Sequence, residues 1–113
     1  KVEEVGIVVD PELPWLSCSP DGVVYTEDGV GLLEIKCPMR TMPRENVRPI
    51  RKHWDQIQGS MALLGVKWCD YVLWQPGRMR VKRYEFDENY WKQQLLPGLK
   101  RFYLNQLLPR LVL

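Results

Sequence analysis

The chain has 113 residues, 45% of them hydrophobic, which fits one globular domain over 1–113 and excludes a disordered chain. Sixteen basic and 14 acidic side chains leave a net charge of +2, which alone does not identify a nucleic-acid binder. No run approaches the roughly 20 apolar residues that span a bilayer, so no membrane partner is expected. Cys18, Cys37 and Cys69 lack the spacing of zinc ligands. They favour reduced thiols in an intracellular protein, in the cytoplasm of a bacterial or viral host or in a eukaryotic nucleus or organelle.

The first part of the chain is predicted to form a β-hairpin. An irregular leading loop, with Trp15 and Leu16 as its core anchors, precedes a short strand over 22–25. The Glu-Asp-Gly sequence at 27–29 has the chemistry of a tight reversal. A second strand is expected over 30–37, where a proline ends it.

The rest of the chain is predicted to alternate helices and strands after a proline- and arginine-rich loop over 39–50. The expected elements are a helix over 51–64, strands over 68–74 and 79–86, and a helix over 88–108. Gly65 ends the first helix, Asp87 caps the second, and Pro97 with Gly98 should kink or interrupt it. The order β-β-α-β-β-α predicts a small mixed β-sheet flanked by helices, an α/β or α+β fold.

Two charged residues lie on a strand that is otherwise apolar. Glu34 and Lys36 are separated by a single position, so on a β-strand they project from the same face. Leu32, Leu33 and Ile35 indicate a central, mostly buried strand, where unpaired charges are costly. A structural ion pair is one interpretation, although buried ion pairs stabilise weakly. A functional site is the other interpretation.

Asp21 supplies a second carboxylate. It precedes Glu34 in the chain, at the start of a strand that the hairpin folds back onto the Glu34 strand. Two carboxylates in a shared site repel each other, and a divalent cation such as Mg²⁺, which prefers oxygen ligands, removes that cost. Alone, Asp21 is more simply a turn residue before Gly22. Together with Glu34 and Lys36, it favours a metal site.

The predicted first helix adds two polar candidates. Gln58 follows Trp54 by about one helical turn on the apolar stripe, so its buried amide must find hydrogen-bond partners. Those partners are either core backbone groups or a water or phosphate near the metal. Gln56 lies about 160° away around the helix and is expected to be more exposed. His53 is a candidate phosphate contact, although a lone histidine is more often structural.

Basic residues gather in two groups after the predicted hairpin. One group runs from Arg40 to Lys52, with Glu45 as its only acid. The second group consists of Arg78, Arg80, Lys82 and Arg83. Because the acids concentrate in the part of the chain up to Glu34, this asymmetry can seat a polyanion beside an acidic metal pocket. Two solvated surfaces would have the same composition.

Three ordered blocks of sequence carry a resemblance. They are Ser-Pro-Asp-Gly at 19–22, Gly-Leu-Leu-Glu-Ile-Lys-Cys-Pro at 31–38, and Gln-Ile-Gln-Gly-Ser-Met at 56–61. Over about 15–75 the chain resembles the YqaJ-type viral recombinase family, which includes phage lambda exonuclease, within the PD-(D/E)XK nuclease superfamily. The resemblance implies a restriction-endonuclease-like core. Because Ser19 lies close to the start of the sequence, the family's helical region before this motif is expected to be absent.

The resemblance also implies roles for individual residues. Asp21, Glu34 and the backbone carbonyl of Ile35 would hold Mg²⁺, with Mn²⁺ as a substitute, while Lys36 positions the attacking water and Gln58 completes the catalytic set. The expected nucleic-acid contacts are Ser19, Arg40, Arg44, Arg51, Lys52 and His53. The implied activity is exonucleolytic hydrolysis of linear double-stranded DNA, with a single-strand annealing protein as partner and homo-oligomers in some members.

Three other interpretations stay open. The same core residues would serve an endonuclease or an RNA-directed enzyme, because they hydrolyse any phosphodiester. A non-catalytic nucleic-acid-binding module would have no need of paired acids facing a polyanion. A purely structural domain, in which Glu34 and Lys36 form an ion pair, would bind neither Mg²⁺ nor Mn²⁺.

Overall fold

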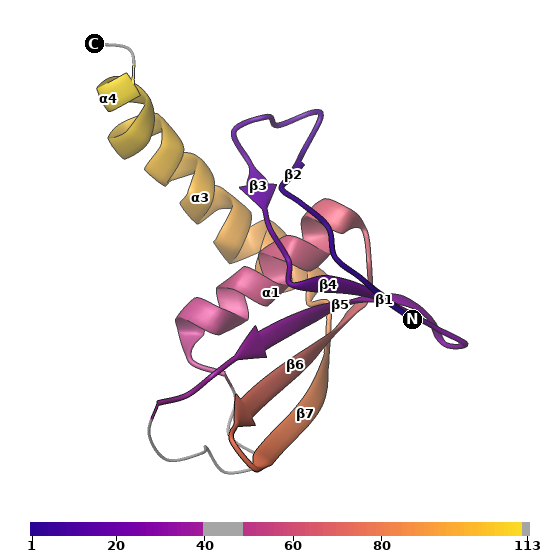
Figure 1. Ribbon diagram of the computed structural model, residues 1–113. Coiled ribbons are helices and arrows are strands. Elements are labelled where there is room, and N and C mark those ends of the chain that lie inside the picture. The colour runs from indigo at the N-terminus through magenta and orange to yellow at the C-terminus, as the bar shows by residue number, and fades with distance from the viewer. Residues whose placement is uncertain (40–48, 112–113) are drawn as a thin grey trace.

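A mixed five-stranded sheet organises the computed structural model, which describes residues 1–39 and 49–111. The strand order across this sheet is β1-β4-β5-β6-β7, and a separate two-stranded ribbon joins β2 and β3 (Figure 1). The strands are β1 (Val2–Glu3), β2 (Val8–Val9), β3 (Ser17–Cys18), β4 (Gly22–Thr26), β5 (Gly29–Lys36), β6 (Trp68–Gln75) and β7 (Arg78–Glu85). The predicted α+β fold class is therefore confirmed.

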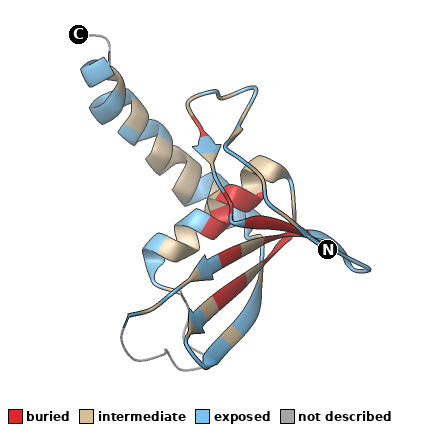
Figure 2. Cartoon of the chain, in the orientation of Figure 1, coloured by how far each residue is buried: buried red, intermediate tan, exposed pale blue. Residues whose placement is uncertain are grey.

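One helix connects the two central strands. Strands β5 and β6 pair in parallel, while β4 and β7 pair antiparallel to their neighbours. A parallel connection needs a crossover, and α1 (Arg51–Leu64) supplies it, ending at Gly65 with a φ of 69°. Leu32, Ile57, Met61 and Cys69, all fully buried, form the centre of the core between α1 and the sheet (Figure 2). The site residues of β5 therefore lie beside the hydrophobic core.

On the opposite face of the sheet, close packing against β5 requires a glycine at position 31. A Cβ atom added to Gly31 would lie 2.2 Å from the Trp68 ring, far inside any real contact distance. Trp68 itself is 9% exposed, and the Arg83 guanidinium stacks on it at 3.6 Å from the ring centroid. The absence of a side chain at position 31 thus lets the indole pack directly on β5.

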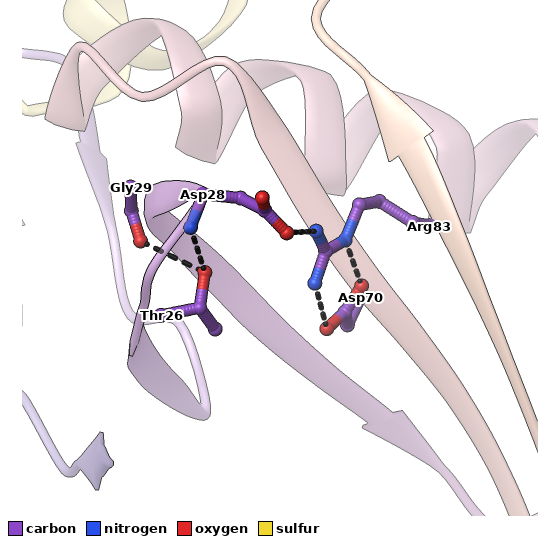
Figure 3. A network of polar contacts seen from close by, with 5 residues as sticks. All are labelled: Thr26, Asp28, Gly29, Asp70 and Arg83. Carbon is purple, nitrogen blue, oxygen red and sulfur yellow. Dashed lines mark hydrogen bonds and ion pairs between the residues drawn. The ribbon is translucent and has the colours of Figure 1, made fainter.

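An arginine links several strands on that same face. The Nε and Nη2 atoms of Arg83 donate hydrogen bonds of 2.8 and 3.1 Å to the two carboxylate oxygens of Asp70 (Figure 3). Asp28, in the turn between β4 and β5, lies 3.9 Å from Nη1 of the same guanidinium. Thr26 braces that turn by accepting a hydrogen bond from the Asp28 amide and donating one to the Gly29 carbonyl. The Arg83 side chain of β7 therefore ties β6 to the hairpin turn.

The carboxy-terminal helix is continuous but irregular. It consists of α2 (Glu88–Tyr90), η1 (Trp91–Leu95), α3 (Leu96–Phe102), η2 (Tyr103–Leu107) and α4 (Leu108–Leu111), and it extends away from the sheet (Figure 1).

Its start and its irregularities have local causes. Asp87 caps the helix, as predicted, by accepting a hydrogen bond from the Tyr90 amide. The predicted interruption near Pro97 takes the form of a π turn, in which the Leu96 amide donates to the Trp91 carbonyl. A second π turn precedes Pro109. The wider turn accommodates a residue that has no N–H to donate.

The segment before Ser19 holds short strands that were not predicted. Strand β1 pairs with β4 at the sheet edge, and β2 pairs with β3. The predicted anchors are in place, since Leu16 is buried and Trp15 stacks on Tyr103 with ring centroids 5.0 Å apart. Within the described ranges 1–39 and 49–111, no helix is long and apolar enough to cross a membrane.

Candidate metal-dependent active site

Glu34 and Lys36 project from the face of β5 that α1 covers. Their alternation on the strand was predicted, and the Lys36 ammonium lies 4.0 Å from the Glu34 carboxylate. The Glu34 side chain is 1% exposed and the Lys36 side chain 24%. The strand therefore carries a buried acid and, one pleat further on, an ammonium that reaches solvent.

Asp21 reaches the same place from the neighbouring strand. The β4–β5 register pairs Gly22 with Leu33, so its continuation by one position sets Asp21 opposite Glu34. Oδ2 of Asp21 accepts a hydrogen bond of 2.7 Å from the backbone N–H of Ile35. The Asp21 side chain thus adds one hydrogen bond to the β4–β5 ladder, just before β4 begins. This hydrogen bond fixes the position of the Asp21 carboxylate relative to β5. The metal-ligand role of the Ile35 carbonyl stays a prediction.

The environment of the Glu34 carboxyl group disfavours its charged form. Its Oε1 atom is buried and has no hydrogen-bond partner among the described residues. Burial, and secondarily the nearby Asp21 carboxylate, raises the pKa of Glu34 from 4.5 to about 7, while Lys36 acts in the opposite direction. Two close carboxylates with an unsatisfied, inward-facing oxygen are what a divalent cation would stabilise.

The donor set therefore fits a hard cation with an open coordination sphere. Asp21 and Glu34 offer carboxylate oxygens, and Mg²⁺ typically takes one or two carboxylates and completes its shell with water and substrate oxygens. Within the described residues, no group of three or more His, Cys, Asp or Glu side chains could hold a metal. The two carboxylates are therefore the residues that would hold a cation such as Mg²⁺ or Mn²⁺.

The two glutamines of α1 lie as the helical spacing predicted, with Gln58 buried and Gln56 exposed. Gln58 is fully buried, but its Nε2 donates to the Glu85 carbonyl at 3.0 Å and its Oε1 accepts from the Asp87 amide at 2.8 Å. Both polar atoms serve backbone groups, which is one of the two kinds of partner expected for Gln58, and its catalytic role stays a prediction. Gln56 contacts a site residue directly, because its Oε1 accepts a hydrogen bond of 2.7 Å from Lys36. Sequence reasoning missed Gln56, although its i, i+3 spacing from His53 places both on one side of α1.

His53 borders the site through a tyrosine. Its Nδ1 atom lies 2.7 Å from the hydroxyl of Tyr71, which stands opposite Glu34 on β6. Burial, followed by the charges of Lys36 and Lys52, lowers the pKa of His53 below its usual value. The neutral form of His53 is therefore favoured, so its expected phosphate contact would be a hydrogen bond more than an ion pair.

The other expected nucleic-acid contacts are distributed unevenly. Ser19 and Lys52 line one pocket of about 370 Å³ together with Gln56, whose side chain also contacts Lys36. Arg51 is exposed at the start of α1 and lies 3.8 Å from Asp55. The remaining two, Arg40 and Arg44, lie outside the described residues.

Comparisons with a family model and with solved structures found matches to this chain. A model of the YqaJ-like viral recombinase domain matches residues 1–66, more than half of the chain. The fold is similar to the crystal structure of an alkaline exonuclease, LHK-Exo, from Laribacter hongkongensis, with 26% identity, a TM-score of 0.63, and coverage of 99% of this chain. The structure of LHK-Exo in complex with dAMP gives a TM-score of 0.64 at the same identity and coverage.

The chain spans 64% of the length of LHK-Exo. No curated protein matches the sequence. The three sequence blocks, the mixed sheet and the matched domain model agree, and the predicted resemblance is confirmed. This chain belongs to the YqaJ-like viral recombinase domain family.

Proposed function

We propose that this chain is the core of a Mg²⁺-dependent deoxyribonuclease that acts as an exonuclease on linear double-stranded DNA in recombination or repair. The observation that carries the proposal is the convergence of Asp21, Glu34 and Lys36 at one point of the sheet. The similarity to LHK-Exo, an alkaline exonuclease whose structure with dAMP has been determined, supports DNA as the substrate.

In this proposal each residue has its own role in phosphodiester hydrolysis. Asp21 and Glu34 would hold the cation, which supplies Lewis-acid activation and neutralises charge at the scissile phosphate. Lys36, positioned by Gln56, would donate a hydrogen bond that orients the attacking water. The water oxygen forms a bond to phosphorus and gives up one proton to solvent, while the ester P–O bond breaks and the leaving oxygen takes up a proton from solvent.

The proposal is tested with DNA labelled at either end. Linear duplex, closed circular duplex and RNA are each incubated with the protein and Mg²⁺, Mn²⁺ or a chelator. We expect mononucleotides from linear duplex, in the presence of metal only, and no cleavage by Lys36→Ala. Cleavage of closed circles would indicate an endonuclease, and cleavage of RNA alone would indicate a ribonuclease. Metal-independent binding without any cleavage would contradict the enzymatic assignment.

Association with other chains is a separate part of the proposal. A single-strand annealing protein and a second copy of this chain are the partners that family membership suggests. Light scattering with and without DNA tests self-association, since a ring would raise the mass by an integer factor. Pull-down with a purified annealing protein tests the second contact.

A further inference from the structure

Two basic side chains of β7 lie in register with the site. The ladder aligns Glu34 with Tyr71, and Tyr71 with Lys82. The next row in the same direction along β5 aligns Lys36 with Leu73 and Arg80. Aligned positions on neighbouring strands point to the same face of a sheet. Lys82 and Arg80 therefore belong to the face that carries the carboxylates.

Side-chain contacts agree with this placement. The Lys82 ammonium lies 5.4 Å from the centroid of the Tyr84 ring, and Tyr84 packs edge-on against Trp54 of α1. Arg83, at the intervening position, is bound to Asp70 on the opposite face. The α1-covered face of β7 thus carries the basic side chains that the sequence grouped together, apart from Arg83.

The charge on this face changes from β5 to β7. The acids of β6 and β7, Asp70 and Glu85, occupy alternate positions that point to the opposite face. Among the strand positions of the α1-covered face in β5, β6 and β7, Glu34 is the single acid. Moving from β5 to β7, the surface therefore changes from a carboxylate site to a cationic edge, and such an edge attracts a polyanion.

We propose that Arg80 and Lys82 bind backbone phosphates of the DNA substrate away from the cleaved bond. The inference rests on the proposed function, and it predicts that the DNA extends from the site on β5 towards β7. Strand β7 lies two strand spacings from β5, about 10 Å, which equals the rise of about three base pairs. A lysine and an arginine at that distance contact phosphates of any sequence, so they supply affinity and not base specificity.

The test is the salt dependence of DNA binding, measured in chelator so that no cleavage occurs. The double variant Arg80→Gln, Lys82→Gln is compared with wild type and with Lys67→Gln, Lys100→Gln. The control removes the same charge from two exposed side chains, one before β6 and one in α3. Each lost phosphate contact reduces the slope of log K against log salt by about 0.9, so the double variant should lose about 1.8.

In practical terms, between 50 and 200 mM salt wild type should lose about tenfold more affinity than the double variant. Lys82→Gln alone, a change at an exposed side chain, should lower the slope by about 0.9, and Lys82→Arg should restore it. An unchanged slope in the double variant, or an equal drop in the control, overturns this inference. Absence of both binding and metal-dependent cleavage in wild type would instead overturn the proposed function.

Discussion

The buried carboxyl group of Glu34 makes a measurable contribution to stability in the absence of metal. Its pKa is raised from 4.5 to about 7, so the folded protein favours the neutral form. The stabilisation that this preference gives is complete below pH 4.5 and is lost as the pH rises through about 7. At 1.36 kcal/mol for each tenfold change in proton affinity, the loss is about 3 kcal/mol by pH 8.

Glu34→Gln replaces the ionisable group with a neutral amide of similar shape. In chelator at pH 8, we expect the variant to be more stable than wild type by about 3 kcal/mol. At pH 4.5 and below, where Glu34 is protonated, the two proteins should unfold at nearly the same urea concentration. The comparison cancels the pH dependence of every other group, because only position 34 differs.

Urea unfolding at pH 4 and pH 8 measures the effect, with Glu27→Gln as the matched control in the exposed hairpin turn. Mg²⁺ at pH 8 should then stabilise wild type, since a ligand that binds the folded state adds RT ln(1 + [L]/Kd), and should leave Glu34→Gln almost unchanged. A stability difference that does not vary between the two pH values would refute the argument, because it would mean that burial of the carboxylate carries no cost.

Four further outcomes are expected. Lys36→Ala should lower the rate of DNA cleavage at least roughly a hundredfold in a gel assay, while calorimetry shows Mg²⁺ affinity and melting temperature near wild type; cleavage at the wild-type rate would exclude its assigned role. Gln58→Ala should lose about 3 kcal/mol in urea unfolding, because two partly buried backbone groups lose their partners. Gln56→Ala should leave stability within about 0.5 kcal/mol but reduce kcat about ten- to hundredfold, and the reverse pattern would favour the catalytic role predicted for Gln58. Gly31→Ala should lower the melting temperature by several degrees, since its Cβ would lie 2.2 Å from the indole packed against it, whereas Gly6→Ala, with nothing within 4 Å, should not.

Most elements of the fold were predictable because their signals are local. The hairpin turn, the glycine that ends α1 and the Asp87 cap each depend on a few adjacent residues. Alternation and helical spacing then assign the long segments. Strands β1, β2 and β3 have two residues each, which is too short for any periodicity, and their partners are set by tertiary contacts.

The site was predictable only where strand geometry determined it. Alternation aligns Glu34 with Lys36, and the hairpin brings Asp21 opposite Glu34. The two glutamines could not be separated in this way. A helical wheel predicts which amide is buried, but the groups that satisfy Gln58 are 27 and 29 residues away in the chain. Only the packed structure shows that they are its partners.

The same glutamine connects segments that lie far apart in the chain. Gln58 fastens the middle of α1 to the point where β7 passes into the carboxy-terminal helix, and Gln56, half a turn earlier, touches Lys36. The start of the projecting helix and the Lys36 ammonium are therefore both attached to α1, at points less than one helical turn apart.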